Sequence, residues 1–476
     1  MKNLLKFKPM LLMMALTLIF TSCSDDDNAI APIIPDTGQN IVELALATPE
    51  LTSLVAALQA ADGDLVNVLS GDGPFTVLAP TNAAFTAFLT ANGFGSLDEV
   101  PTDVLSQILL NHVISADLTA SDLTGLGAGY TSTNASGVGG NNISIYFNTT
   151  NGVRFNNVSA VSTADIDASN GTIHIVDAVI PIPSVVDHAV ANANFSSLVA
   201  ALGASDIDLV ALLSSEGPYT VLAPDNAAFT TFLDGGDLGG VNTAVLTQVL
   251  LNHVLSKTVL STDLTTAGAG YDNTNATGAG MNPMSIYFDT TEGVVFNGIS
   301  EVTTADIVGS NGIIHAVNTV IGLPTVVTFA AANPNFSTLV QALTTLTPAT
   351  PFETILARTE GNNLDGNNPN FTVFAPTNDA FAALPEVPGE VVLTQVLLHH
   401  VVGEANVTSG DLTNPGDTTA ATLQGQDITV TLPGTGDNIA DVTDGSGVTD
   451  IGIIAVDVQA VNGVIHVLNK VMIPNL

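Results

Sequence analysis

The sequence is poor in basic residues and in cysteine, and it has no tryptophan. Seven residues are Lys or Arg against 45 Asp and Glu, which gives a formal net charge of −38 at pH 7. Nucleic acids and anionic lipids are bound mainly through Lys and Arg, so this balance excludes both as partners of the chain's surface. With one cysteine the chain has no disulfide framework, and apolar cores must stabilise it instead. Its 46% of hydrophobic residues are enough to build them.

The first residues are typical of an export signal. Lysines at positions 2, 6 and 8 precede an apolar run that ends at Phe20, and this run is too short for a stable membrane helix. Cys23 follows directly behind two small residues, so the segment resembles the lipidation signal of a bacterial lipoprotein. We predict a signal peptide over residues 1–22 and lipidation at Cys23. The alternative is an ordinary cleaved signal in which the cysteine is incidental.

An acidic tether is predicted over residues 23–39. Its sequence begins Cys-Ser-Asp-Asp-Asp, and Asp25–Asp27 resemble the tag that sends lipoproteins of the Bacteroidetes to the outer face of the outer membrane. The alternative is a solvated linker without any targeting role. We therefore expect a lipid-anchored outer-membrane protein that faces the cell exterior, with the lipid as its only contact with the membrane.

Three short phrases recur in the same order along the chain. The first reads TVLAPTNAAF at 76–85, TVLAPDNAAF at 220–229 and TVFAPTNDAF at 372–381. The second reads LLNHV at 109–113, LLNHV at 250–254 and LHHVV at 398–402. The third reads NGTIH at 170–174, NGIIH at 311–315 and NGVIH at 462–466. The common spacing is too long for a solenoid unit, so it predicts three self-sufficient domains over 40–183, 184–324 and 325–476.

Each phrase has a local structural meaning. Thr76–Leu78 are β-branched or apolar and suit a buried strand that Pro80 ends, and Thr81 is a good N-cap for a following helix. The second phrase lies at the end of an amphipathic helix. The third phrase is an Asn-Gly turn leading into a strand, which we expect to end at Pro181.

Six of the eight histidines recur with these phrases. Three are expected in the helix and three in the strand: His112, His253 and His400, and then His174, His315 and His466. We interpret them as buried, hydrogen-bonded structural residues. The alternative is a metal site that pairs them with Asp165, Asp306 or Asp457, each nine residues before its strand histidine. No H-E-x-x-H, C-x-x-C or G-x-S-x-G motif is present. We therefore predict no metal, no cofactor and no enzymatic activity.

Together the phrases resemble the fasciclin domain family, in which a T-V-F-A-P-T-N-x-A-F segment, a Tyr-His pair and an N-G-V-I-H segment follow one another. The resemblance covers nearly all of residues 40–474. It implies an α+β fold of three tandem fasciclin-like domains, each a β-sandwich with helices packed at one end. The first two copies look like near relatives, whereas the third has a glycine- and aspartate-rich segment in place of SIYFNTTNGV.

The resemblance also implies adhesion and extracellular binding instead of chemistry. Family contacts near the Tyr-His pair are not carried over, because the tyrosine position holds Asn111, Asn252 and His399. A second family contact is an Asp-Ile pair before the third phrase. It is matched by Asp165-Ile166 and Asp306-Ile307, with Asp457-Val458 in the third copy. We take these as candidate adhesive residues, the alternative being a turn aspartate beside a core aliphatic residue.

The sequence thus predicts a non-catalytic cell-surface protein that presents three fasciclin-like domains. Its expected partners are an extracellular glycan, a matrix protein or the surface proteins of neighbouring cells. Two alternatives remain open: a carbohydrate-capture lipoprotein of a nutrient uptake system, and a metal-assisted hydrolase. The connections VIPIPSVV at 179–186 and VIGLPTVV at 320–327 are short and proline-bearing, so we expect them to restrict the geometry between neighbouring domains.

Overall fold

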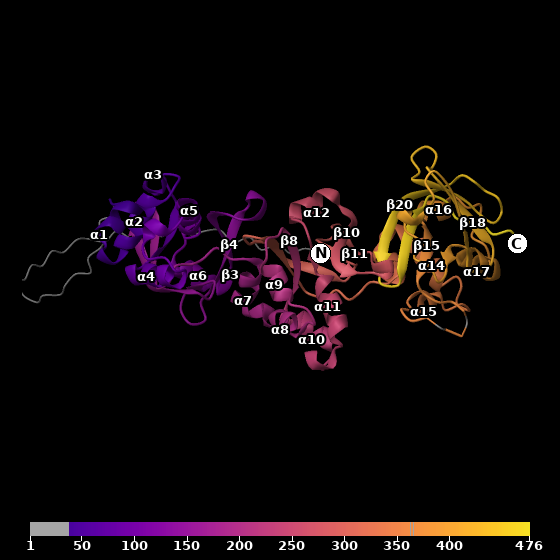
Figure 1. The fold of residues 1–476 in the computed structure, drawn as a ribbon, viewed down its shortest axis with the longest axis horizontal. Helices are drawn as coiled ribbons and strands as arrows, with labels where there is room; N and C mark the ends of the chain where they lie inside the picture. The colour runs from indigo at the N-terminus through magenta and orange to yellow at the C-terminus, as the bar shows by residue number, and fades with distance from the viewer. Residues whose placement is uncertain (1–37, 362, 365) are drawn as a thin grey trace, which may run out of the picture. The chain divides into compact units, whose positions relative to one another are not determined.

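The computed structural model describes residues 38–361, 363–364 and 366–476, which form three domains with equivalent strands in the same order (Figure 1). The predicted signal peptide, Cys23 and the tether as far as residue 37 lie outside the described residues. In the part of the chain that is described, no single helix is long and apolar enough to cross a membrane. One bent pair, Ile41–Ala47 with Pro49–Ala60, meets those criteria by length and composition together.

The first domain alternates short helices with a seven-stranded sheet. Its helices are α1 (Ile41–Ala47), α2 (Thr52–Ala60), α3 (Leu65–Ser70), α4 (Asn82–Ala91), α5 (Thr102–Leu110) and α6 (Ala120–Leu126). Its strands are β1 (Phe75–Pro80), β2 (Val113–Ile114), β3 (Ala128–Ser136), β4 (Asn142–Asn148), β5 (Arg154–Phe155), β6 (Ser159–Ala168) and β7 (Gly171–Val176).

The second domain repeats this order closely. Its helices are α7 (Val185–Ala191), α8 (Ser196–Ala204), α9 (Leu209–Ser214), α10 (Asn226–Leu233), α11 (Thr243–Leu251) and α12 (Ser261–Ala267). Its strands are β8 (Tyr219–Pro224), β9 (Val254–Leu255), β10 (Ala269–Thr277), β11 (Pro283–Asp289), β12 (Val295–Phe296), β13 (Ser300–Val308) and β14 (Gly312–Val317).

The third domain keeps the order but replaces the helix after its second strand with a 3-10 turn, η8 (Ser409–Asp411). Its helices are α13 (Val326–Ala332), α14 (Ser337–Thr344), α15 (Phe352–Leu356), α16 (Asn378–Ala382) and α17 (Glu390–His399). Its strands are β15 (Phe371–Pro376), β16 (Val401–Val402), β17 (Gly416–Ala421), β18 (Asp427–Leu432), β19 (Ala440–Thr443), β20 (Ile451–Ala460) and β21 (Gly463–Leu468).

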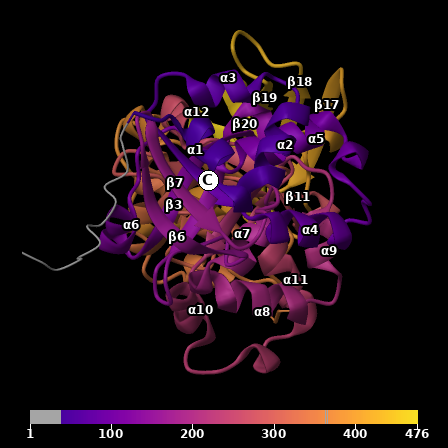
Figure 2. The same ribbon diagram turned by 90° about the vertical axis from the view of Figure 1, so that its left-hand side faces the viewer.

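The sheets share one topology. In the first domain the strand order is β2-β1-β7-β6-β5-β4-β3, and the other two sheets follow the equivalent order. The first and last strands of each domain, such as β1 and β7, pair in parallel, and all other pairs of named strands are antiparallel. Figure 2 shows β6 and β7 side by side. The phrases that lie far apart in sequence therefore meet on three neighbouring strands, β2, β1 and β7, at one end of the strand order.

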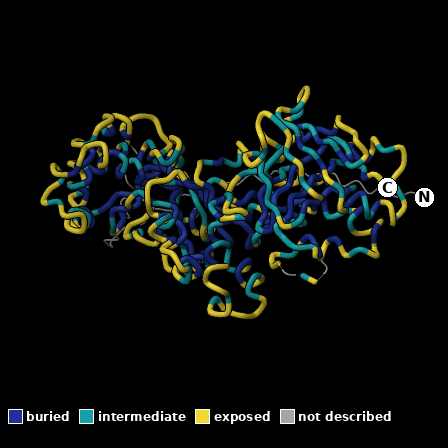
Figure 3. The backbone as a smooth tube through the Cα atoms, turned by 45° about the vertical axis from the view of Figure 1, so that its right-hand side comes forward, coloured by how far each residue is buried: buried dark blue, intermediate teal, exposed yellow. Residues whose placement is uncertain are grey.

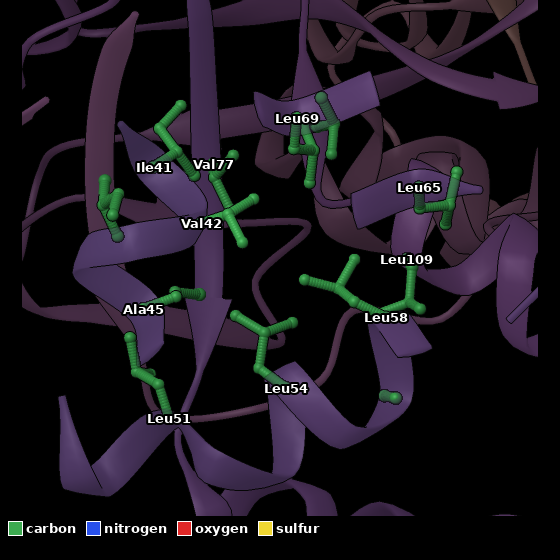
Figure 4. Close-up of a cluster of buried hydrophobic side chains, with 14 of the residues drawn as sticks. Ile41, Val42, Ala45, Leu51, Leu54, Leu58, Leu65, Leu69, Val77 and Leu109 are labelled. Carbon is green, nitrogen blue, oxygen red and sulfur yellow. The ribbon is translucent and has the colours of Figure 1, made fainter. Parts of the chain in front are cut away.

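Alternate residues of β1 belong to two separate hydrophobic cores. Val77 and Ala79 of β1 belong to a cluster formed with the helices α1, α2, α3 and α5 (Figure 4). Leu78 lies in a second cluster with Phe147 of β4 and Phe155 of β5. A sheet whose two halves enclose one core while helices cover another is a β-sandwich with helices at one end, so the expected α+β fold is confirmed. Figure 3 shows that buried stretches of the backbone lie in the interior and exposed stretches at the periphery.

The first phrase is the strand and capped helix that the sequence predicts. Thr81 precedes α4, and its hydroxyl accepts a hydrogen bond from the backbone N of Ala84 at 3.2 Å. The next residue, Asn82, accepts from the backbone N of Ser53 at 2.8 Å and donates to the carbonyl of Pro49 at 3.0 Å. Asn226 and Asn378 make the equivalent pair of bonds. The phrase recurs because each domain uses it twice. In the first domain it caps α4 and forms hydrogen bonds to the N-terminal part of α2 and to Pro49 just before it.

Two local predictions were wrong. The strand of the third phrase ends at Val176 instead of Pro181, because β1 also ends there, at Pro80, and offers no further partner. His112 and His253 lie beyond the ends of α5 and α11, and His400 is the C-cap of α17. These helices end early because the short strands β2, β9 and β16 begin immediately afterwards.

Candidate functional site

The second phrase forms hydrogen bonds to the segment after the last strand, through which the chain exits each domain. The ring of His112 is 1% exposed; Nδ1 donates to the carbonyl of Ile108 at 2.7 Å, and Nε2 accepts from the backbone N of Ile180 at 2.9 Å. Beside it, the amide of Asn111 donates to the carbonyl of Pro181 at 3.1 Å. The ring thus satisfies a carbonyl at the end of α5 while the pair fixes the exit segment.

The other two domains repeat this arrangement. His253 donates to Val249 at 2.7 Å and accepts from Ile321 at 2.9 Å. His400 donates to Val396 at 2.7 Å and accepts from Met472 at 2.9 Å. Burial lowers the pKa of all three histidines to about 4, with the backbone bond raising it by a smaller amount. They are therefore neutral at physiological pH.

The strand histidines are also bound to the backbone. His174 donates from Nε2 to the carbonyl of Leu118 at 2.8 Å, and its Nδ1 accepts from the backbone N of Asp165 at 3.2 Å. The equivalent carbonyls are those of Val259 for His315 and Val407 for His466, at 2.9 and 2.8 Å. Through these bonds the ring of His174 links β7 to the segment before α6. The role of the ring is therefore structural.

The alternative metal site is not assembled by these residues. Nδ1 of His174 lies 3.9 Å from a carboxylate oxygen of Asp165, and the same distance separates His315 from Asp306. Within residues 38–361, 363–364 and 366–476, no group of three or more His, Cys, Asp or Glu is placed to hold a metal ion. The ring nitrogens of His112 and His174 already take part in the backbone hydrogen bonds described above.

The candidate adhesive aspartates lie at a bulge in β6, β13 and β20. Asp165, Asp306 and Asp457 have φ values of 58°, 58° and 63°, a left-handed conformation that Asp tolerates better than most residues. The strand register shifts at each of them. Oδ1 of Asp165 accepts from the backbone N of Ala120 at 2.7 Å, at the start of α6. Each aspartate therefore shapes the backbone and accepts a hydrogen bond at the N-terminus of α6, α12 or η8.

The three aspartates differ in their second carboxylate oxygen. In the second and third domains the hydroxyls of Ser261 and Ser409 donate to Oδ2 of Asp306 and Asp457. The first domain has Ala120 at this position, which has no hydroxyl to donate. The Asp165 side chain is also more exposed than that of Asp306, at 47% against 33%. Asp165 is thus better placed than Asp306 to meet another molecule.

Comparison with known proteins identifies the repeat. Fasciclin domain patterns match residues 49–183, 193–324 and 334–474, which together make up most of the chain. The chain belongs to the fasciclin domain family. The three recurring phrases are therefore fasciclin phrases, and the resemblance inferred from them is confirmed.

Sequence relatives occur in human and in Synechocystis. Human periostin is 27% identical over 454 residues, covering 93% of this chain and 48% of periostin, so the chain spans about half of that relative's length. Protein sll1483 of Synechocystis sp. is 38% identical over 145 residues, covering 30% of this chain and 74% of that protein. A fasciclin domain pair from the insect cell adhesion molecule fasciclin I covers 57% of this chain and 96% of its own, with 17% identity and a TM-score of 0.36.

The aliphatic partner of the adhesive pair is covered in two of the three fasciclin domains. Ile166 is partly buried, whereas Ile307 is 1% and Val458 is 4% exposed. In the second domain the backbone N of Val308 donates to the hydroxyl of Ser144, on β4 of the first domain, at 2.9 Å. Gln459 and Ser285 make the same bond between the third and second domains, also at 2.9 Å.

Tyrosines on the preceding domain complete this contact. The hydroxyl of Tyr130 accepts from Asn192 at 3.2 Å, and its ring packs against His188 with a centroid separation of 5.7 Å. Tyr271 repeats both contacts with Asn333 and Phe329, at 3.0 and 5.7 Å. Burial raises the pKa of Tyr271 to about 12. Tyr130 also packs against the core cluster that contains Ile307, and Tyr287 belongs to the cluster that contains Val458, so each junction lies beside the Asp-Ile pair of the following domain.

Sequence reasoning missed some of the residues that connect distant segments within each domain. Asn170, in the third phrase, accepts from the backbone N of Ile41 at 3.0 Å and donates to Leu69 and Gly71 at 2.8 Å each. Its recurrence with the Asn-Gly turn was visible, but its partners lie far away in sequence. The adjacent Gly171 is required because a Cβ there would lie 1.9 Å from the carbonyl oxygen of Phe75.

Proposed function

We propose that this chain is a non-catalytic adhesion protein, anchored by lipid at the outer membrane and exposed on the cell surface. Its proposed partners are an extracellular glycan, a matrix protein or surface proteins of neighbouring cells. Fasciclin domains over most of the chain support a binding role, since the family resemblance implies adhesion. The hydrogen-bonded histidines give a metal-assisted hydrolase no specific support.

The exposed Asp165 carries the proposal of a contact surface. Of the three equivalent positions, the one in the first domain combines a carboxylate that has no serine partner with an aliphatic neighbour that is only partly buried. A carboxylate beside an apolar side chain suits a ligand with hydrogen-bond donors next to an apolar group. We therefore place the adhesive surface at Asp165 and Ile166, because Asp306 and Asp457 are bonded to serines of their own domains.

Binding of the purified chain, residues 24–476, to an array of glycans and matrix proteins tests the binding function. Asp165→Asn should weaken retained binding at least about tenfold, because it removes the charge while keeping the shape of the side chain. Asp306→Asn is the matched control and should leave binding unchanged. Binding that is insensitive to Asp165→Asn contradicts the assigned surface, and an array with no ligand contradicts adhesion. Retention of soluble glycans alone favours carbohydrate capture.

The anchor is tested separately in cells. Cys23→Ala should release the protein from the membrane fraction, because the thiol that would carry the lipid is absent. Replacing Asp25–Asp27 with Ala should leave it membrane-bound but protected from protease added outside. Membrane retention of the Cys23→Ala protein contradicts lipidation. Continued protease access after the aspartate substitutions contradicts the export tag alone.

A further inference from the structure

The third domain contains an apolar cavity of about 180 Å³ between its helices and the central strands. Its walls come from α13, α14, α15, β15 and β21, and include Ala330, Leu339, Phe352, Val373 and Ile465. All five of these side chains are at most 9% exposed. The volume exceeds the gaps that ordinary core packing leaves, and an engineered cavity of about 150 Å³ is large enough to bind benzene.

The second domain shows that this space is a particular property of the third. At the equivalent place it has a cavity of about 20 Å³, too small for a ring. Every residue that lines this smaller cavity has a counterpart in the lining of the larger one, for example Ala189 with Ala330, Leu198 with Leu339 and His253 with His400. What differs is the connection between the two helices above the cavity, which runs over residues 345–351 in the third domain against 205–208 in the second.

The interior of the cavity offers no hydrogen bond to water. The polar side chain at its inner end is His400, and both of its ring nitrogens are already bonded to Val396 and Met472. A buried water needs two or more polar partners, so an apolar cavity of this kind stays dry and favours an apolar occupant. The mouth is different, since Ala331, Thr344 and Glu353 are exposed there.

We propose that this cavity is a binding site for a small molecule with a single aromatic ring. The ring fills the space between Ala330, Leu339 and Ile465, where it leaves water without leaving any polar group unsatisfied. A polar head on the molecule lies at the mouth beside the Glu353 carboxylate, which favours a cationic head over an anionic one. This activity is separate from the adhesive surface of the first domain.

Benzene titrated into the intact chain, residues 24–476, tests the site by methyl NMR. Saturable shifts are expected for Leu339, Leu343 and Ile465, with none for Leu198 and Leu202 in the second domain. Ala330→Leu should abolish the shifts because the added side chain occupies the cavity. Ala189→Leu, the matched control, should leave them unchanged. Absence of saturable shifts in the parent chain, or their survival in Ala330→Leu, overturns the proposal.

Stability separates a filled cavity from a misfolded variant. Ala330→Leu should keep or raise the unfolding temperature of the third domain, because it fills empty space. Ala189→Leu should lower that of the second domain, because it overpacks a closed core. Equal losses in both variants overturn the proposal, since they show that the third domain has no room either.

The head group is tested with a pair of probes of equal ring size. Benzylamine should bind at least about threefold more tightly than benzoate, and Glu353→Gln should remove that preference while leaving the affinity for benzene unchanged. Equal binding of both probes to the parent chain overturns the assigned orientation. Loss of benzene binding in Glu353→Gln overturns the placement of Glu353 at the mouth.

Discussion

The second and third fasciclin domains share a framework of hydrogen bonds and strand pairing. They differ in the residues at the surface that contacts a neighbouring domain and in the size of an internal cavity. Both fix their exit segment through a buried histidine and both pair their first and last strands in parallel. The second domain presents Tyr271 and Tyr287 to its successor, whereas the third has Thr419 and Thr429 at the equivalent paired positions. The third domain therefore diverges at the strand pair through which the second domain contacts it.

The same comparison separates two kinds of constraint on a repeated domain. Residues that close the fold, such as Asn82, His112 and Asn170, recur because every copy needs them. Residues that contact the next domain, such as Tyr130 and Tyr271, recur in the first two domains and not in the third. Thr419 and Thr429 accordingly share a hydrogen bond within their own hairpin, with their hydroxyl oxygens 3.4 Å apart.

The largest effect is expected from a substitution that removes the tyrosine contact between the second and third domains. Tyr287→Thr gives the second domain the residue of the third, and it removes a ring that is 2% exposed within the apolar core cluster of the third domain. We expect the third domain to lose about 3 kcal/mol, measured by hydrogen exchange of its peptides. Tyr219→Thr, which opens the core of the second domain itself, should destabilise that domain first. An unchanged third domain in Tyr287→Thr would show that the contact contributes nothing.

Acid should distinguish the same two domains. Burial lowers the pKa of His188 and His253 in the second domain to about 4, while the third has Phe329 in place of His188. A lowered folded-state pKa means that stability is complete above the unfolded value of about 6.5 and is lost as pH falls towards 4. Each such histidine then costs on the order of 3 kcal/mol at pH 4.

The matched variant is His188→Phe, which copies the third domain. It should reduce the loss of stability of the second domain between pH 7 and pH 4, as measured by denaturant unfolding at both pH values. The third domain, whose buried His400 is unchanged, is the internal reference. An acid sensitivity that is the same with and without His188 would contradict its assigned role.

A smaller effect tests the shared framework. His253→Ala leaves the backbone N of Ile321 unpaired, and His400→Ala leaves that of Met472 unpaired, so each variant should lose about 1–3 kcal/mol. The two losses should agree within about 1 kcal/mol, because the bonds are the same. Chemical unfolding monitored in each domain measures them. A loss confined to one domain would show that the framework is not equivalent.

The smallest effect concerns the helix caps of the first phrase. Thr81→Ala, Asp225→Ala and Thr377→Ala each remove a side chain that accepts from a backbone N–H of the first helical turn. Each should cost about 1 kcal/mol, and the cost should be similar in all three domains. Thermal unfolding of the single variants tests this, with Thr86→Ala as a control on the exposed side of α4. A cap variant that behaves like the control would contradict the assigned cap.

The fold was predictable because its signals are local or repeated. A β-branched run, a proline and a capping residue are enough to specify the strand and helix of the first phrase, and three copies of that phrase reveal the domains. The tasks of Asn82 and Asn170 were not predictable, because their partners are set by the closed sheet. The bulge at Asp165 was equally hidden, since a positive φ at an aspartate leaves no pattern in a single sequence.

The candidate site and the cavity were harder to predict from the sequence than the fold. The Asp-Ile pair reads almost the same in the first two domains, yet only the first leaves its isoleucine partly exposed, because coverage depends on the neighbouring domain. The residues that line the smaller cavity also have counterparts in the larger one, although the volumes are about 20 and about 180 Å³. Volume depends on the spacing of helices, which the lining residues do not encode.

The anchoring of the two ends of each domain determines how it would carry mechanical tension. The entry helix is held at the turn before the last strand, where Asn170 accepts from Ile41, and the exit segment is held just beyond that strand by His112. A pull on the chain therefore runs along β7, whose bonds to β1 and β6 must break together in shear. We expect single-molecule pulling to show one abrupt rupture per domain, and His112→Ala to lower its force by releasing the exit segment first. Gradual extension of the parent chain would contradict this load path.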